Sequence, residues 1–286
     1  MKYLIVLTTL ISTLFTGISV AGNTSTLEQI KNTETIRIGF RENEPPMSFL
    51  NKDKLPVGYS IELCLQIVNE IKGKLKNPNI ATKYVPVTAS NRFEALQNNS
   101  IDILCGSTTK TLSRSELVDF TQLTFVTGAA LLSLKSSHIG KIRDLEDKKI
   151  AIVKDTTTFE HLTKILNKGD STAKIIAVDS ASTGMDLVAK GKVDAFASDQ
   201  IVLIALLLTH EDKEKFTISE DLFSYEPFAL AVRRNDADFR LIADRVLSRL
   251  NRSGDITVLY SQWFGTYIKK VPTLLEAMYI LNATPE

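Results

Sequence analysis

Cysteine, histidine and tryptophan are scarce in this sequence, and each scarcity excludes a class of protein. The 286 residues include two cysteines, three histidines and one tryptophan. Two cysteines are too few for a small fold held together by several disulfides. No spacing of histidine and cysteine matches a zinc site, so we expect no metal and no other cofactor. The scattered histidines also do not compose a Ser-His-Asp or Cys-His catalytic group.

The sequence also lacks an excess of charge of either sign. It holds 34 lysines and arginines against 33 aspartates and glutamates. A protein with this balance has no strong electrostatic attraction to nucleic acid or to an anionic membrane surface, and we expect neither as a partner. Hydrophobic residues make up 44% of the chain, which is enough for one large core or two smaller ones.

The N-terminus has the features of a secretory signal peptide. Lys2 precedes an apolar run over residues 4–20, and the small-x-small pattern Ser19-Val20-Ala21 follows it. We therefore expect residues 1–21 to be a signal peptide and the mature protein to be periplasmic. A membrane anchor is the alternative, although the run is short and ends at a processing site.

The two cysteines, Cys64 and Cys105, allow one disulfide in an oxidising compartment. Cys64 falls on a predicted amphipathic helix and Cys105 at the end of a predicted strand. Each could equally be a buried, small apolar residue. We favour two free, buried cysteines over a disulfide.

The hydrophobic pattern alternates between strands and helices in two successive halves. The predicted strands of the first half are 35–40, 82–87 and 101–104, and those of the second half are 149–153, 174–178 and 193–197. Predicted helices, including 27–32, 60–71, 159–166 and 201–208, lie between or before them. This alternation predicts an α/β fold. A long β-rich run follows each half, at 125–134 and 225–234, which suggests two lobes joined by paired hinge strands. Helices at 236–249, 254–264 and 274–281 are expected to return to the first lobe.

One strand end has the composition of a carboxylate-binding loop. Cys105-Gly106-Ser107-Thr108-Thr109 follows the strand 101–104, and Arg114 comes five residues later. Free backbone N–H groups and hydroxyls at a strand end can donate hydrogen bonds, and a guanidinium adds a planar two-pronged donor. The alternative is a polar loop with a surface arginine.

Other charged or hydroxyl residues also follow predicted strands, at the sheet edge where α/β proteins bind ligands. Arg41 follows the first strand, and Arg92 opens a helix whose dipole it opposes. Thr156 and Thr157 form a strand-to-helix turn suited to an anion. Asp199 could receive an ammonium group. Each has a structural alternative: a solvated charge for Arg41, a salt bridge for Arg92, and helix caps for the threonines and Asp199.

These segments resemble the periplasmic polar amino acid-binding proteins of ABC importers, and most of all the glutamate/aspartate-binding proteins. The resemblance spans nearly the whole mature chain. It rests on Gly39-Phe40-Arg41-Glu42, Val57-Gly58-Tyr59-Ser60, Pro86-Val87-Thr88 with Asn91-Arg92, Cys105-Gly106-Ser107-Thr108-Thr109 with Arg114, Thr156-Thr157, and Asp199. It implies a two-lobe periplasmic binding protein fold of type II, with lobe 1 at 22–130 and 230–286 and lobe 2 at 131–229.

The resemblance also implies a role for each site residue. Arg114 would bind the α-carboxylate of an amino acid, helped by Thr109 and by the Thr156-Thr157 turn. Ser107 and Asp199 would receive the ammonium, while Arg41 and Arg92 would face a side-chain carboxylate. The protein would be a monomer that binds glutamate or aspartate in the interlobe cleft and delivers it to a membrane permease.

The sequence departs from that family at the side-chain end of the expected pocket. Ala89 replaces a serine of the nearest relatives, and Ala181 lies where they have a histidine. In addition, Asp155 replaces a glycine just before Thr156 and so places a carboxylate close to the expected anion site. Another polar amino acid such as glutamine therefore remains an alternative ligand. A second alternative is an enzyme that resembles cyclohexadienyl dehydratases, with Glu42 or Glu44 as its acid or base.

Overall fold

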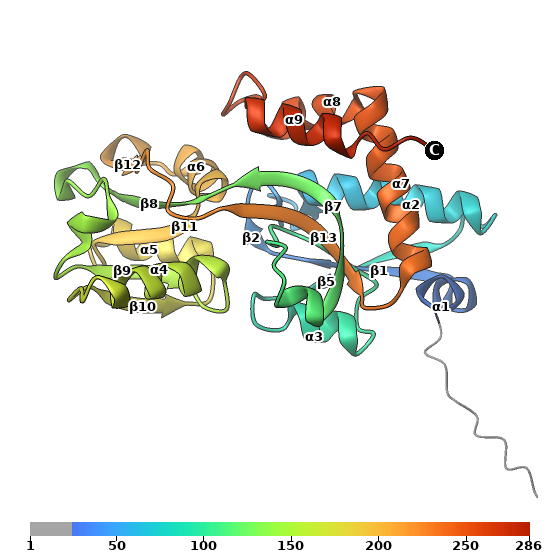
Figure 1. Ribbon diagram of the computed structural model, residues 1–286, viewed down its shortest axis with the longest axis horizontal. Coiled ribbons are helices and arrows are strands. Elements are labelled where there is room, and N and C mark those ends of the chain that lie inside the picture. Colours follow the sequence, from blue (N-terminus) through green and yellow to red (C-terminus); the bar gives the residue numbers. More distant parts are fainter. Residues whose placement is uncertain (1–24) are drawn as a thin grey trace, which may run out of the picture.

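The computed structural model describes residues 25–286, so the predicted signal peptide lies outside the described residues. Two five-stranded mixed sheets stand side by side (Figure 1). The first has the order β5-β1-β6-β13-β7, with β5 at Ala81–Pro86, β1 at Thr35–Phe40, β6 at Ile103–Cys105, β13 at Glu226–Arg233 and β7 at Val118–Thr127. The second has the order β10-β9-β11-β8-β12, with β10 at Lys174–Val178, β9 at Lys149–Val153, β11 at Ala195–Asp199, β8 at Ala129–Leu134 and β12 at Phe216–Ile218. The predicted α/β class is confirmed.

The parallel strands of the first sheet end side by side. Phe40 of β1 is paired with Pro86 of β5 and with Cys105 of β6. The loops that follow these strands therefore start from one edge of the sheet. Helix α2 (Tyr59–Lys74) buries its apolar stripe on one face of this sheet, and α3 (Arg92–Gln97) packs on the other face. We call this sheet and its helices the first lobe.

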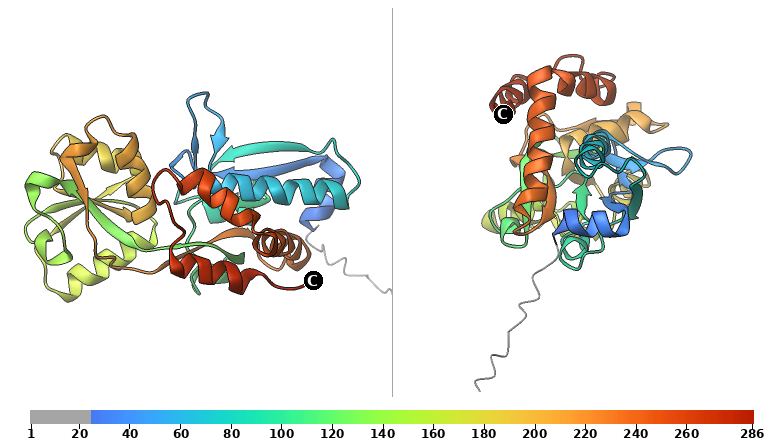
Figure 2. Two further views of the ribbon diagram at one scale, coloured as in Figure 1. Left: turned by 90° about the horizontal axis from the view of Figure 1, so that it is seen from above. Right: turned by 90° about the vertical axis from the view of Figure 1, so that its right-hand side faces the viewer.

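The second sheet repeats this arrangement and forms the second lobe. Its parallel strands β9 and β11 pair through Ile152 and Ala197, so their C-terminal ends are also neighbours. Helix α4 (Thr157–Lys168) covers one face, and α5 (Ala181–Ala189) and α6 (Gln200–Thr209) cover the other. Figure 2 shows the two lobes from two further directions.

The chain crosses between the lobes twice. The first crossing is Gly128, between β7 and β8, and the second lies between β12 and β13. The β-rich run 125–134 is divided at Gly128 into two strands: β7 pairs with β13, whereas β8 pairs with β11 and β12. A Cβ on Gly128 would lie 2.4 Å from the carbonyl oxygen of Ser224, so the close approach of the second crossing requires glycine. The expected lobe limits at 130 and 230 stay a prediction.

Three helices follow β13, and α7 and α9 pack against β7 of the first lobe. They are α7 (Ala237–Ser253), α8 (Asp255–Phe264) and α9 (Thr273–Asn282). A short leading helix, α1 (Thr26–Thr33), and a three-stranded ribbon of β2 (Asn43–Glu44), β3 (Ser48–Leu50) and β4 (Pro56–Val57) complete this lobe. The sequence did not predict β2 or β12, since strands of two or three residues carry no periodic pattern.

Serine side chains cap two of the helices: Ser25 caps α1 and Ser180 caps α5. Gly58 precedes α2 with a φ of 136°, and the hydroxyl of Ser60 in the first turn donates to the carbonyl of Gly106 over 3.0 Å. Helix ends are set by which backbone groups remain unpaired, and the sequence pattern locates them only within a residue or two.

The expectation that both cysteines are free is wrong. Cys64 and Cys105 form a disulfide, with their Cα atoms 6.4 Å apart. The bond joins the middle of α2 to the last residue of β6. It therefore anchors the strand end from which Gly106 and Ser107 continue.

Candidate functional site

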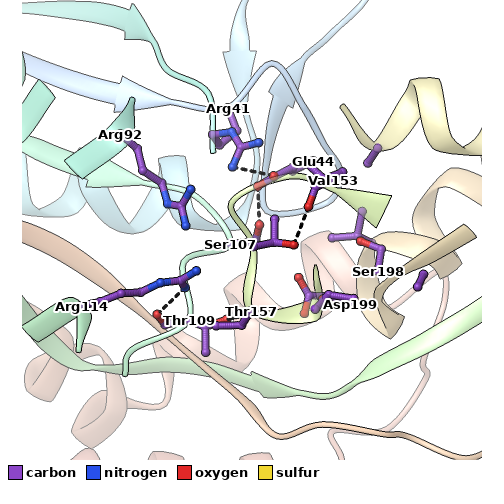
Figure 3. A pocket seen from close by; sticks show the side chains of 15 residues that line it. Arg41, Glu44, Arg92, Ser107, Thr109, Arg114, Val153, Thr157, Ser198 and Asp199 are labelled. Atoms are coloured by element: carbon purple, nitrogen blue, oxygen red, sulfur yellow. Dashed lines mark hydrogen bonds and ion pairs between the residues drawn. The ribbon is translucent and has the colours of Figure 1, made fainter. Parts of the chain in front are cut away.

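The strand ends of the two lobes face each other across one cavity (Figure 3). Every site residue predicted from the sequence lines it: Arg41, Arg92, Ser107, Thr109, Arg114, Thr156, Thr157 and Asp199. The cavity also includes residues that the sequence did not single out as site residues: Glu44, Val153, Thr158, Ala181, Ala197, Ser198 and Val202.

Arg92 is a buried cation whose charge is poorly compensated. It is 3% exposed, and its guanidinium donates to the backbone carbonyl oxygens of Ala89 and Asp155. Its Nε has no hydrogen-bond partner within the described chain. Burial, together with the nearby charges of Arg114 and Arg41, lowers the pKa of Arg92 to about 9. A guanidinium held in this way favours an anion beside it.

Arg114 is a second cation of the same kind. Its Nη1 donates to the carbonyl oxygen of Thr109 over 3.0 Å, and none of the residues 25–286 offers it a carboxylate at ion-pair distance. The ring of Phe93 lies beside both arginines, with its centroid 4.5 Å from Cζ of Arg92 and 5.5 Å from Cζ of Arg114. Burial lowers the pKa of Arg114, an effect opposed by the charges of Glu160, Glu226 and Asp199. Arg114 and Arg92 thus present two unpaired guanidinium groups to the cavity.

Arg41 differs from both because a carboxylate holds it. Arg41 Nη1 lies 2.8 Å from Glu44 Oε1. The other oxygen of Glu44 accepts a hydrogen bond from the hydroxyl of Ser107. The sequence interpretation considered Glu44 only as an acid or base for an enzyme. Its position three residues after Arg41, in the same strand-end loop, was the signal that could have placed it in the site.

Glu226, which the sequence interpretation did not single out, contacts two of the residues that line the cavity. It is fully buried, and its Oε2 accepts hydrogen bonds from the hydroxyls of Thr109 and Thr157, each over 2.6 Å. The hydroxyl of Ser224 donates to its Oε1 over 2.6 Å. Thr109 belongs to the first lobe and Thr157 to the second, so Glu226 joins the two lobes behind the cavity.

The turn before α4 keeps its capping function. Thr156 Oγ1 accepts from the amide of Phe159 over 3.2 Å and donates to the carbonyl of Val153 over 2.7 Å. The hydroxyl of Thr156 is therefore used within the turn. The first amides of α4, at Thr157 and Thr158, have no carbonyl four residues earlier in the helix, and the helix dipole favours an anion in front of them.

Asp199 precedes α6 at the N-cap position, yet its side chain makes no capping hydrogen bond. Its Oδ1 is buried without a partner in the part of the chain that the structure describes. Burial, with the charges of Glu226 and Glu44 adding to it, raises the pKa of Asp199 well above its ordinary value. A carboxylate in this position is stabilised in its charged form by a cation.

The cavity thus complements a small molecule with two anionic groups and one cationic group. Arg92 and Arg114 can each bind an anionic group, and Asp199 can bind the cationic group. Within residues 25–286 there is no group of histidine, cysteine, aspartate and glutamate side chains that could hold a metal ion. None of the helices in the same range is long and apolar enough to cross a membrane.

Comparisons with known proteins identify relatives of this sequence and of this fold. The L-glutamate/L-aspartate-binding protein of Pseudomonas aeruginosa is 31% identical, over 84% of this chain and 80% of the relative. The glutamate/aspartate import solute-binding protein of Escherichia coli is 28% identical over the same shares. The crystal structure of the cysteine-binding protein of Campylobacter jejuni superposes with a TM-score of 0.76 at 24% identity, covering 87% of this chain and 96% of that one.

The last comparison shows the fold, which is the two-lobe type II fold of periplasmic amino acid-binding proteins expected from the sequence. The relatives named above are solute-binding proteins and not enzymes. Residues 36–266 match the family described as bacterial extracellular solute-binding proteins, family 3. This chain belongs to that family.

Proposed function

We propose that this protein is the receptor of an amino acid ABC importer and that it binds an acidic amino acid, glutamate or aspartate, between its lobes. The observation that carries the proposal is the set of unpaired buried charges: Arg92 and Arg114 on one side of the cavity and Asp199 on the other. An acidic amino acid is a zwitterion with a second carboxylate, so it supplies two anions and one cation.

Each end of the ligand then has a defined place. Arg114 and the first amides of α4 bind the α-carboxylate, in the arrangement that suits an anion at a helix N-terminus. Asp199 and Ser107 receive the ammonium. Arg92 faces the side-chain carboxylate. Charge-assisted hydrogen bonds of this kind contribute about 1.5–3 kcal/mol each, enough together to offset the entropy cost of association.

The same geometry describes how binding closes the protein. Arg114 and Arg92 belong to the first lobe, whereas Asp199 and the start of α4 belong to the second. A ligand that contacts both lobes stabilises the closed form because the open form offers only part of these contacts.

Glutamine is the second candidate ligand. Ala181 lines the cavity and Ala89 is buried beside Arg92, so neither supplies a polar group to a side-chain carboxylate. An enzyme has less support: Glu42 is exposed and Glu44 is occupied by Arg41 and Ser107.

The proposal includes export and a membrane partner. The names of the relatives point to a protein outside the cytoplasmic membrane that passes its ligand to an importer. We infer that residues 1–21 direct export to the periplasm, that the mature protein acts as a monomer, and that its closed form docks on a membrane permease.

Calorimetric titration of the mature protein with acidic, amide and basic amino acids tests the ligand class. We expect one-to-one binding of glutamate or aspartate and its loss in Arg114→Ala. Absence of binding to any amino acid, with turnover of prephenate instead, would overturn the proposal in favour of an enzyme.

A further inference from the structure

Arg41 and Glu44 form an ion pair inside the cavity, and this pair distinguishes Arg41 from the other arginines. Both residues are 8% exposed, and 2.8 Å separates Arg41 Nη1 from Glu44 Oε1. The second oxygen of Glu44 is hydrogen-bonded by Ser107. Both carboxylate oxygens are therefore engaged by groups of the same cavity (Figure 3).

Arg92 and Arg114 lack this kind of partner. Their guanidinium hydrogen bonds go to backbone carbonyl oxygens, and Arg92 Nε makes none within the described residues. The positive charge of Arg41 is neutralised by the protein itself, while the charges of the other two are not. A ligand carboxylate gains more at an uncompensated guanidinium than at one that already has a carboxylate.

We propose that Glu44 is a specificity-determining residue: it holds Arg41 as an internal ion pair, so that Arg92 alone binds a carboxylate on the side chain of the ligand. This inference rests on the proposed function. A ligand carboxylate that approached Arg41 would come within a few ångströms of Glu44, where like charges repel. Glu44 thus limits how strongly the pocket prefers a carboxylate over an amide.

In this proposal, Arg41 neutralises the negative charge of Glu44. Replacing Arg41 leaves Glu44 unpaired in the cavity, where it repels an acidic ligand. Replacing both residues removes the negative charge of Glu44, which repels the ligand, together with the positive charge of Arg41, which compensates it. If Arg41 instead bound the ligand carboxylate directly, the double variant would still lack that contact, and its selectivity would stay well below that of wild type.

Selectivity, defined as the Kd for glutamine divided by the Kd for glutamate, is the quantity to measure. Both ligands share the α-carboxylate and the ammonium, so effects on those groups cancel in the ratio. The variants are Glu44→Gln, Arg41→Gln and the double variant, titrated by calorimetry with competition where binding is weak. Glu42→Gln is the matched control, because Glu42 is exposed in the same loop and the substitution removes the same charge.

We expect selectivity to rise about tenfold in Glu44→Gln, to fall about tenfold in Arg41→Gln, and to return to within about threefold of wild type in the double variant. Glu44→Ser must change selectivity in the same direction as Glu44→Gln. The inference is overturned if the selectivity of the double variant is as low as that of Arg41→Gln. It is also overturned if the selectivity of Glu44→Gln equals that of Glu42→Gln. Wild-type protein that binds no acidic amino acid would overturn the proposed function, and the inference with it.

Discussion

Thr157 and Glu226 connect the two lobes through one hydrogen bond, donated by Thr157 Oγ1 to Glu226 Oε2 over 2.6 Å. Thr109 donates to the same oxygen, and Ser224 to the other. A threonine hydroxyl has a single proton. In this arrangement the protons of Thr109 and Thr157 are directed at Glu226, so neither hydroxyl has a proton left to donate into the cavity.

The Thr157–Glu226 contact predicts the effect of Thr157→Val. Valine keeps the branched shape but removes a donor from a fully buried carboxylate, at a cost of about 1–3 kcal/mol. Because this bond joins the lobes, we expect affinity for every amino acid ligand to fall by about tenfold, with selectivity unchanged. Thr163→Val is the control, since Thr163 lies on the same helix and its hydroxyl has no partner among the residues described. Equal effects in calorimetry would contradict the prediction.

Asp199 predicts how affinity depends on pH. Its pKa is raised by burial in the ligand-free protein, and a bound ammonium lowers it again. Ligand binding therefore releases a proton, and affinity decreases as the pH falls through the raised pKa. Calorimetry in buffers of different ionisation enthalpy measures the released proton. Binding without proton release across the acidic range would argue against Asp199 as the ammonium partner.

The same residue predicts a trade-off between stability and binding. A carboxyl whose pKa is raised by folding contributes stability below its unfolded pKa, and this contribution is lost as the pH rises through the folded value. At neutral pH we therefore expect Asp199→Asn to stabilise the ligand-free protein by roughly 1 kcal/mol, or about 2–4 °C in Tm, while abolishing ligand binding. A lower Tm in thermal melts would show that Asp199 stabilises the fold.

Arg92 is expected to discriminate between carboxylate and amide side chains. In Arg92→Gln we predict that glutamate affinity falls by about 10-fold to 150-fold, the range of one charge-assisted hydrogen bond, while glutamine affinity changes much less. Arg92→Lys keeps the charge without the planar fork and should lie between the two. Equal losses for both ligands would mean that Arg92 does not contact the side chain.

The disulfide predicts a stability effect that is separate from ligand recognition. Cys64 and Cys105 are 41 residues apart in sequence, and closing a loop of that size stabilises the native state by about 4 kcal/mol in the chain-entropy description. We expect the Cys64→Ala/Cys105→Ala variant to unfold at lower denaturant concentration by about that free energy. The selectivity ratio should remain that of wild type; a changed ratio would mean that the bond also shapes the pocket.

Local patterns were sufficient for most of the fold. Strands such as 35–40 and 149–153 were predicted with their observed limits, because apolar β-branched runs ended by turn residues are local signals. The short strands β2 and β12 were missed. Gly128 was missed as a crossing point, because its requirement comes from Ser224, 96 positions later in the chain.

In the candidate site, too, local sequence patterns were sufficient for some residues and not for others. Arg41, Arg92, Arg114 and Asp199 were found because each follows a predicted strand, and parallel strands of one sheet end at a common edge. Glu44 and Glu226 were not found as site residues. For Glu44 the spacing of three residues from Arg41 was a usable signal, whereas nothing in the residues around Glu226 indicates burial beside two threonines.

The sequence by itself therefore predicted the α/β class, the strand ends that carry charge, and residues that line one cavity. The tertiary structure decided which of those charges are already paired. Periodicity and turn chemistry act over a few residues, whereas the Arg41–Glu44 pair, the Cys64–Cys105 bond and the bridge from Thr157 to Glu226 exist only where folding brings separate loops together. Charge compensation is a property of that proximity, and it makes Arg92 and Arg114, but not Arg41, available to a ligand.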